Sequence, residues 1–246
     1  MGLNKRLFTG VEAASGFDLK FDSNKLWYNP TSFAEIVEDG RVFNGNKDLI
    51  NGQGEGECYT NYYFQSGGTN KYYMEMAVDV THPYGIYTLS FVDSDAYTGQ
   101  TNVNNAYSNR IGYFNRVVYG SQYSNMFVDA YNGAISGGDS NSNTHTPNPD
   151  AQGEAVAVAV DEAYRRVWFG SLIGSSLSWI GGGNPATGAS PTFTLPSSWG
   201  TYQFVAADAS WSGASARHAH HRIRKPINIM GSLPSGYSHM QGVYEV

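Results

Sequence analysis

Valine and alanine alternate strictly from Ala155 to Val160, within the most informative stretch of the chain, Gly153 to Phe193. A period of two is typical of a β-strand, and here one face carries β-branched residues and the other small ones. Residues 161–164 (DEAY) are suited to a turn, and residues 165–170 (RRVWFG) predict a returning strand. The pattern therefore predicts an antiparallel hairpin, followed by a glycine-rich loop that carries Trp179.

Short alternating segments separated by turn residues run along the rest of the chain. They predict strands at 36–38, 41–43, 59–65, 72–80, 86–92, 111–119, 126–131 and 202–207. Asp39-Gly40 and Asn132-Gly133 are tight-turn sequences, and residues 44–57 are expected to form a loop. No segment combines the amphipathic period and the caps of a helix.

These patterns predict an all-β fold, an antiparallel jelly-roll sandwich of two packed sheets with long loops and little or no helix. We expect one sandwich over residues 21–246, preceded by an arm or edge segment at residues 1–20. Residues 136–152 are rich in Gly, Ser and Asn and have the composition of a linker. We favour a surface loop there, because the strand before it needs the hairpin after it to complete a sheet.

Composition agrees with this fold and limits the partners. The chain has 29 glycines, 18 tyrosines and only 15% charged residues, as expected for short strands with long loops. A net charge of -6 argues against a nucleic-acid partner. Cys58 is the only cysteine, so no intrachain disulfide forms, which fits a reducing compartment. No apolar run has the length of a signal sequence or the roughly 18 residues of a membrane span, so we expect no membrane insertion.

Four segments in this order resemble the SPRY-type, concanavalin A-like sandwich found in bacteriophage structural proteins. They are Lys71–Val78 (KYYMEMAV), Ala157–Gly170 (AVAVDEAYRRVWFG), the loop Trp179–Gly188 and Leu233–Tyr237 (LPSGY). The likeness spans residues 20–246. It implies a concanavalin A-like or SPRY-like sandwich and a place in a virion assembled in a host cytoplasm.

No catalytic constellation stands out in the sequence. Retaining glycosidases of this class need two carboxylates about 5 Å apart, usually on an E-x-D-x-x-E strand, which this chain lacks. Glu75 and Asp79 share a strand face but are separated by roughly 13 Å of strand. We expect them to be solvated or rim carboxylates, and we expect no enzyme activity.

Metal binding is weakly indicated at two places. His218 and His220 project from one strand face, and Asp93 and Asp95 follow a strand in a turn. The histidine pair has no nominated third ligand, and the aspartate pair would need nearby loop carbonyls to bind Ca²⁺. We favour an exposed strand face and an ordinary turn, and predict no metal and no cofactor.

A basic run near the C-terminus is the first candidate contact surface. It consists of Arg217, His218, His220, Arg222, Arg224 and Lys225. On a strand, His218, His220, Arg222 and Arg224 would share one face, which suits an acidic surface of another subunit or an anionic glycan. The alternative is a solvated edge strand whose charges block aggregation.

Three tryptophans in or beside loops are the second candidate surface: Trp179, Trp199 and Trp211. Exposed aromatic rings suit sugar stacking or protein contact. The favoured alternative is that each ring anchors a long loop onto the sandwich.

The sequence thus predicts a non-enzymatic bacteriophage virion structural protein, as a capsid decoration, tail or fibre component. Its expected partners are other virion proteins and further copies of itself, because virion positions are symmetric. The alternative is a carbohydrate-binding module that recognises a host surface glycan.

Overall fold

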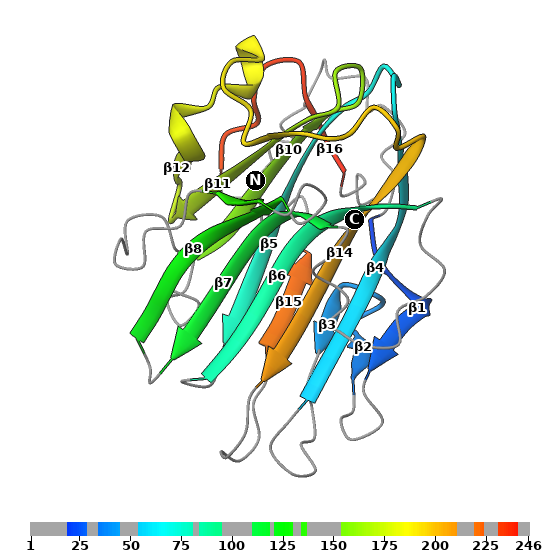
Figure 1. The fold of residues 1–246 in the computed structure, drawn as a ribbon, viewed down its shortest axis with the longest axis vertical. Helices are drawn as coiled ribbons and strands as arrows, with labels where there is room; N and C mark the ends of the chain where they lie inside the picture. The colour runs from blue at the N-terminus through cyan, green and yellow to red at the C-terminus, as the bar shows by residue number, and fades with distance from the viewer. Residues whose placement is uncertain are drawn as a thin grey trace, which may run out of the picture.

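The computed structural model describes residues 19–28, 34–44, 54–80, 84–94, 110–118, 121–129, 134–136, 154–210, 219–223 and 231–240. These residues form two β-sheets packed face to face, as Figure 1 shows. The predicted all-β antiparallel sandwich of jelly-roll type is therefore confirmed.

The first sheet has seven strands, all paired antiparallel. From edge to edge it runs β1 (Phe21–Tyr28), β4 (Gly54–Gln65), β14 (Thr201–Ser210), β6 (Tyr84–Asp93), β7 (Arg110–Val118), β8 (Ser121–Asp129) and β9 (Ala134–Ser136).

The second sheet has nine strands. Its main path is β12 (Ser176–Trp179), β11 (Arg166–Ile173), β10 (Glu154–Asp161), β5 (Lys71–Val80), β15 (Ala219–Ile223), β3 (Val42–Asn44) and β2 (Glu35–Val37). β13 (Phe193–Thr194) pairs with β11, and β16 (Ser238–His239) pairs in parallel with β5. Two single 3₁₀ turns follow β12: η2 (Ile180–Gly182) and η3 (Pro185–Thr187). Among the described residues, no helix is long and apolar enough to cross a membrane.

The predicted hairpin forms the middle of the second sheet. β10 and β11 pair along their whole length, and β10 also pairs with β5. The valines of β10 lie in the main core between the sheets, together with Cys58. Ala157 and Ala159 face a second, smaller core with Tyr73, Trp168 and Tyr237. Small residues are needed there because the C-terminal segment covers the outer face of the sheet closely.

Several other strands lie at their predicted positions to within a few residues, and two strands begin well before their predicted starts. The Asp39-Gly40 turn joins β2 to β3, with positive φ at both residues. β4 begins at Gly54, inside the predicted loop 44–57, because Gly56 and Glu57 pair with both β1 and β14. β8 begins at Ser121, before the predicted start at residue 126, because it pairs with β7 over that length. Tertiary pairing overrides local strand propensity in both places.

The predicted N-terminal arm and the predicted loop 136–152 are only partly described. Leu19, assigned to the predicted arm, is fully buried in the main core, and Lys20 donates from its backbone N to Asn61 Oδ1. Residues 1–18 lie outside the described residues, as does most of the predicted loop 136–152.

Glu75 corrects the prediction of a solvated carboxylate. Its side chain is fully buried on the outer face of β5. Oε1 accepts hydrogen bonds from Tyr73 Oη and from the backbone N of Gly231, both at 2.7 Å. The C-terminal segment covers this face, so a residue that the strand period placed on the polar side lies under a second layer of chain.

Glu162 joins the two sheets at one end of the sandwich. This turn residue is fully buried. Its carboxylate accepts from Gln65 N of β4 at 2.9 Å, from Asn70 Nδ2 at 3.0 Å and from Tyr62 Oη at 3.4 Å. Its backbone O accepts from Gly67 N at 3.0 Å. One side chain therefore fixes the β10–β11 turn against the chain segment that crosses from β4 to β5.

Replacing the Glu162 carboxylate tests how much it contributes to the free energy of unfolding. Glu162→Ala is expected to lower the free energy of unfolding by about 2 kcal/mol, because the part-buried donors of Gln65 and Asn70 lose their buried acceptor. Equilibrium urea unfolding measures the change. Thr69→Ala, an exposed substitution in the adjacent turn, is the control and should change stability by less than about 0.5 kcal/mol. Equal effects of the two substitutions would contradict the assignment.

Candidate binding surface

The predicted basic run is only partly described. Arg217, His218, Arg224 and Lys225 lie outside the described residues, as does Trp211. His220 lies in β15, in register with Asp79 of β5 and Asn44 of β3. β15 therefore lies between two strands, and the alternative of a solvated edge strand is wrong. A local pattern does not reveal this position, because β3 comes from far earlier in the chain.

Arg222 is the one member of the run whose side chain is described. It forms a two-pronged ion pair with Glu38, in which Nη1 contacts Oε2 and Nη2 donates to Oε1 at 3.0 Å. The neighbouring Ile223 points into the main core, so the predicted alternation of faces holds at these two positions. The charge of Arg222 is balanced within its own chain, which weakens it as an attractor for an outside anion.

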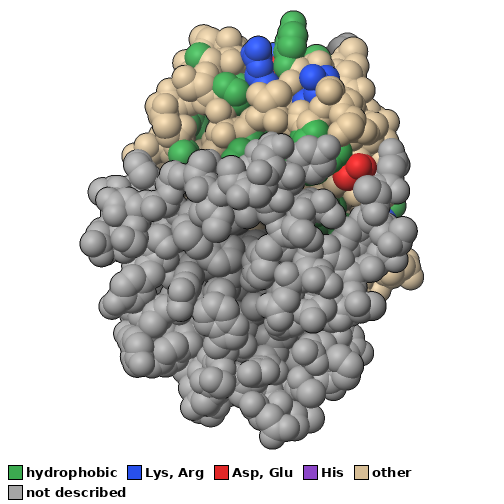
Figure 2. All heavy atoms as spheres, viewed as in Figure 1, with side chains coloured by type: hydrophobic (Ala, Val, Ile, Leu, Met, Phe, Trp, Pro, Cys, Tyr) green, Lys and Arg blue, Asp and Glu red, His purple; other side chains and the backbone are tan. Residues whose placement is uncertain are grey.

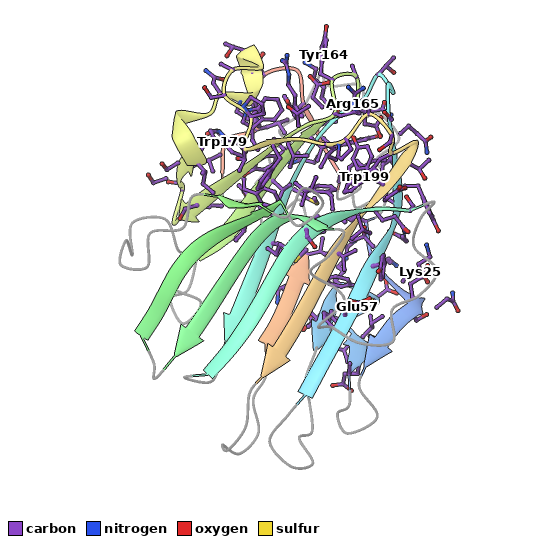
Figure 3. The ribbon with its side chains drawn as sticks, viewed as in Figure 1. Lys25, Glu57, Tyr164, Arg165, Trp179 and Trp199 are labelled. Carbon is purple, nitrogen blue, oxygen red and sulfur yellow. The ribbon has the colours of Figure 1, made fainter. Side chains whose placement is uncertain are left out.

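The two described tryptophans of the predicted aromatic surface are packed. Trp199 is 1% exposed and lies in the main core, which leaves no indole face for a ligand. Trp179 is half-buried and packs edge-on against Tyr73, with ring centroids 6.3 Å apart. Both rings fit the anchoring alternative, and Figure 3 shows both within the outline of the molecule.

A different aromatic residue projects at that end. Tyr164, in the turn between β10 and β11, is 59% exposed and extends from the molecule in Figure 3. Asp161 shapes this turn, because its Oδ1 accepts from the backbone N of Ala163 at 3.1 Å and of Tyr164 at 3.4 Å. Asp161 Oδ2 also forms an ion pair with Lys71 at 3.1 Å. Asp161 therefore fixes the conformation of the turn, and the Tyr164 ring remains exposed to solvent.

Arg166 connects Tyr164 to a neighbouring loop. Its guanidinium carbon lies over the Tyr164 ring, 4.8 Å from the centroid, and Nη1 donates to Gly188 O at 3.1 Å. A guanidinium over an aromatic face is a favourable arrangement. We call Tyr164, Arg166 and the loop 184–190 the hairpin-tip surface.

The loop 184–190 is closed by its own hydrogen bonds. Asn184 caps η3 by accepting from Thr187 N at 3.3 Å, and its backbone pairs with Ala189. Trp168 Nε1 donates to Ala189 O at 2.9 Å and holds the loop on the second sheet. The side chains of Asn184, Thr187 and Ser190 are exposed, so the loop presents amide and hydroxyl groups beside the aromatic tip.

One buried phenol and two arginines lie near this end of the sandwich. Burial raises the pKa of the Tyr202 phenol above its ordinary value, and the nearby carboxylates of Glu162 and Asp161 raise it further. Among the described residues, no carboxylate forms an ion pair with Arg165 or Arg166. Figure 2 shows hydrophobic and basic side chains together at this upper end. The surface is suited to stacking and to donating hydrogen bonds.

Sequence reasoning missed Tyr164, although a signal for it was present. Turn positions favour Gly, Asn, Asp and Ser, so a large aromatic residue in the turn DEAY is unusual. The connection of Tyr164 to Gly188 through Arg166 could not be predicted from the sequence, because it depends on the register of β10 and β11 and on the path of the later loop. The part of the chain that the structure describes holds no group of three or more metal-ligating side chains.

Comparisons with known proteins add little beyond this geometry. No family model and no curated protein matches the sequence. Among solved structures, lectin II from Ulex europaeus is 9% identical, with 85% of this chain and 94% of that chain covered and a TM-score of 0.46. The TRIM65 PSpry domain is 12% identical, with coverages of 84% and 89% and a TM-score of 0.45. The Emp47p carbohydrate recognition domain is 11% identical, with coverages of 83% and 95% and a TM-score of 0.46.

This similarity is too low to assign a family or a ligand. The fold and the hairpin-tip surface define the chain as a β-sandwich protein with an aromatic and basic surface at one end.

Two glycines provide a matched test of the contact between Arg166 and the loop. Gly188 has φ 75°, and a Cβ there would lie 2.7 Å from Arg166 Nη1. Gly181 has φ 64° and nothing within 4 Å of a Cβ. Both alanine substitutions incur about 1 kcal/mol of left-handed strain, and Gly188→Ala should lower the free energy of unfolding further by displacing Arg166. Equal losses in urea unfolding would show that Arg166 does not hold this loop.

Proposed function

We propose that the protein acts by binding carbohydrate, without catalysing a reaction, through the hairpin-tip surface. The observation that carries the proposal is the exposed Tyr164 ring, which Arg166 holds in place while it also bonds to Gly188 O. A pyranose has an apolar C–H face that stacks on such a ring and hydroxyls that accept from a guanidinium. Because the ring is already fixed, little conformational entropy is lost on binding.

The neighbouring loop supports the same proposal. Asn184, Thr187 and Ser190 offer amide and hydroxyl groups, which both donate and accept hydrogen bonds, as sugar hydroxyls do.

A glycan array with Tyr164 variants tests the proposal. Tyr164→Ala is expected to weaken binding of the recognised glycan about tenfold or more, because the stacking face is lost. Tyr164→Phe is the matched control, since it keeps the ring, and it should bind within a few-fold of the unchanged protein. No binding to any glycan, or equal binding by the alanine variant, would reject the hairpin-tip surface as the site.

The second candidate is the virion structural role that the sequence resemblance implies. The segments of the resemblance pack on one another, which concerns the fold and not the role. Tyr237 of Leu233–Tyr237 packs against Trp168 of β11, with ring centroids 6.5 Å apart, and Lys71 of β5 lies 5.7 Å from the Tyr237 ring. This packing supports a shared fold, and the bacteriophage role itself stays a prediction.

Glycan binding, measured together with the mass in solution, separates the two candidates. The virion role predicts a homo-oligomer without glycan binding, and carbohydrate recognition predicts glycan binding whatever the oligomeric state. Light scattering on the purified protein, together with the glycan array, measures both properties. Detection of the chain by mass spectrometry in a purified phage particle would support the structural role.

A further inference from the structure

A second cluster of aromatic and basic groups lies on the outer face of the seven-stranded sheet. It joins Lys25 of β1, Tyr63 of β4 and Gln203 of β14, which are three adjacent strands. We call these three residues the Lys25–Tyr63 site. Figure 3 shows Lys25 near β1, away from Tyr164 at the upper end, so this site is separate from the hairpin-tip surface.

Two irregularities in strand pairing meet at this site. Phe21 faces Thr60 and Leu26 faces Cys58, so β1 advances by five residues while β4 advances by two. The additional residues of β1 form a bulge, in which Asn24 N donates to Asp22 Oδ1 at 2.9 Å. Lys25 follows directly after this turn. Bulges commonly re-aim a side chain near a functional site.

The second irregularity lies in the pairing of β4 with β14. Gln203 faces Tyr63 and Val205 faces Tyr59, so β4 carries two additional residues there. Gln203 is 2% exposed, and its Nε2 donates to Thr60 O of the bulge at 2.9 Å. This bond fixes the amide group, so that its Oε1 points to Lys25. Gln203 therefore acts as a rigid support beneath the cation.

The described contacts of Lys25 involve no opposite charge. Nζ donates to Tyr63 Oη and to Gln203 Oε1, the latter at 2.7 Å, and lies 4.3 Å from the Tyr63 ring centroid. All these partners are neutral. An ammonium group has three donors, so one remains after these two bonds. Among the described residues, no carboxylate forms an ion pair with Lys25.

Other described lysines and Arg222 differ in this respect. Lys20 pairs with Asp39, Lys71 pairs with Asp161, and Arg222 pairs with Glu38. Lys25 has instead a partly exposed phenol ring beside it, since Tyr63 is 43% exposed. An oriented cation with a spare donor, next to an accessible aromatic ring, matches a ligand that carries an anionic group on an apolar ring face.

We propose that the Lys25–Tyr63 site binds the carboxylate of an acidic sugar. A uronic or sialic acid carries its carboxylate on the pyranose ring, so that Lys25 receives the carboxylate while the C–H face of the ring lies against Tyr63. A carboxylate from an acidic peptide has the charge but lacks this rigid apolar face. The site is independent of the hairpin-tip surface, so failure of one proposal leaves the other standing.

Calorimetric titration of the full chain with three probes tests this site. The probes are trigalacturonate, a hyaluronan tetrasaccharide and sialyllactose, each compared with its methyl ester, which removes the charge and keeps the ring. At least one free acid is expected to bind at low salt and to bind about tenfold more tightly than its ester, because a charge-assisted hydrogen bond is lost on esterification. Raising the ionic strength should weaken binding of the acid.

Three variants assign the binding to the site. Lys25→Met and Tyr63→Ala should each raise the dissociation constant about tenfold. Lys20→Met removes the same charge from the same end of the chain and should leave binding unchanged, as should Tyr164→Ala. Thermal unfolding of each variant verifies that it is folded.

Three outcomes would overturn the proposal. They are no binding of any free acid, equal affinity for acid and ester, and an equal loss in Lys20→Met, which would indicate general charge attraction. Tight binding of a hexaglutamate peptide, with no binding of the three sugars, would assign the site to acidic protein segments and also reject the acidic-sugar proposal.

Discussion

The carboxylate of Glu162 joins the two sheets at one end of the sandwich, beside the segment in which the chain crosses from β4 to β5. It accepts hydrogen bonds from β4 and from the segment leading into β5, while it belongs to the turn between β10 and β11. A buried carboxylate needs such donors, because desolvation of an unpaired charge is costly. The same bonds fix the turn that carries Tyr164, so the position of the exposed ring depends on a residue with no exposure of its own.

Several acidic residues are buried, so the net charge of the chain does not describe the charge of its surface. Glu57, Glu75, Asp161 and Glu162 are all buried. A chain with a charge of -6 thereby presents described cations, Lys25 among them, that have no described acidic partner. The negative net charge argues against nucleic acid as a general partner. A single partly exposed cation such as Lys25 can still attract a carboxylate locally. Both proposed surfaces combine such a cation with a tyrosine ring.

The described residues of the two predicted contact surfaces are largely packed or paired within the chain. Arg222 and Ile223 lie on opposite faces as the strand period required, but β15 is an interior strand and Arg222 is paired with Glu38. Trp199 is buried as a loop anchor. A tryptophan or an arginine in a loop has the same local signature whether it packs or projects, and only its neighbours decide which it does. Those neighbours come from distant parts of the chain.

The sequence by itself determined the alternation of β10, the turn at Asp39-Gly40 and the two-sheet architecture, because side-chain period and turn preference are properties of local backbone geometry. The tertiary structure alone decided that Glu75 and Glu162 are buried, that Arg166 reaches Gly188, and that Lys25 lies beside Tyr63 and Gln203. These contacts arise from strand order, bulges and covering segments. They bring together residues whose separation along the chain carries no signal of their proximity.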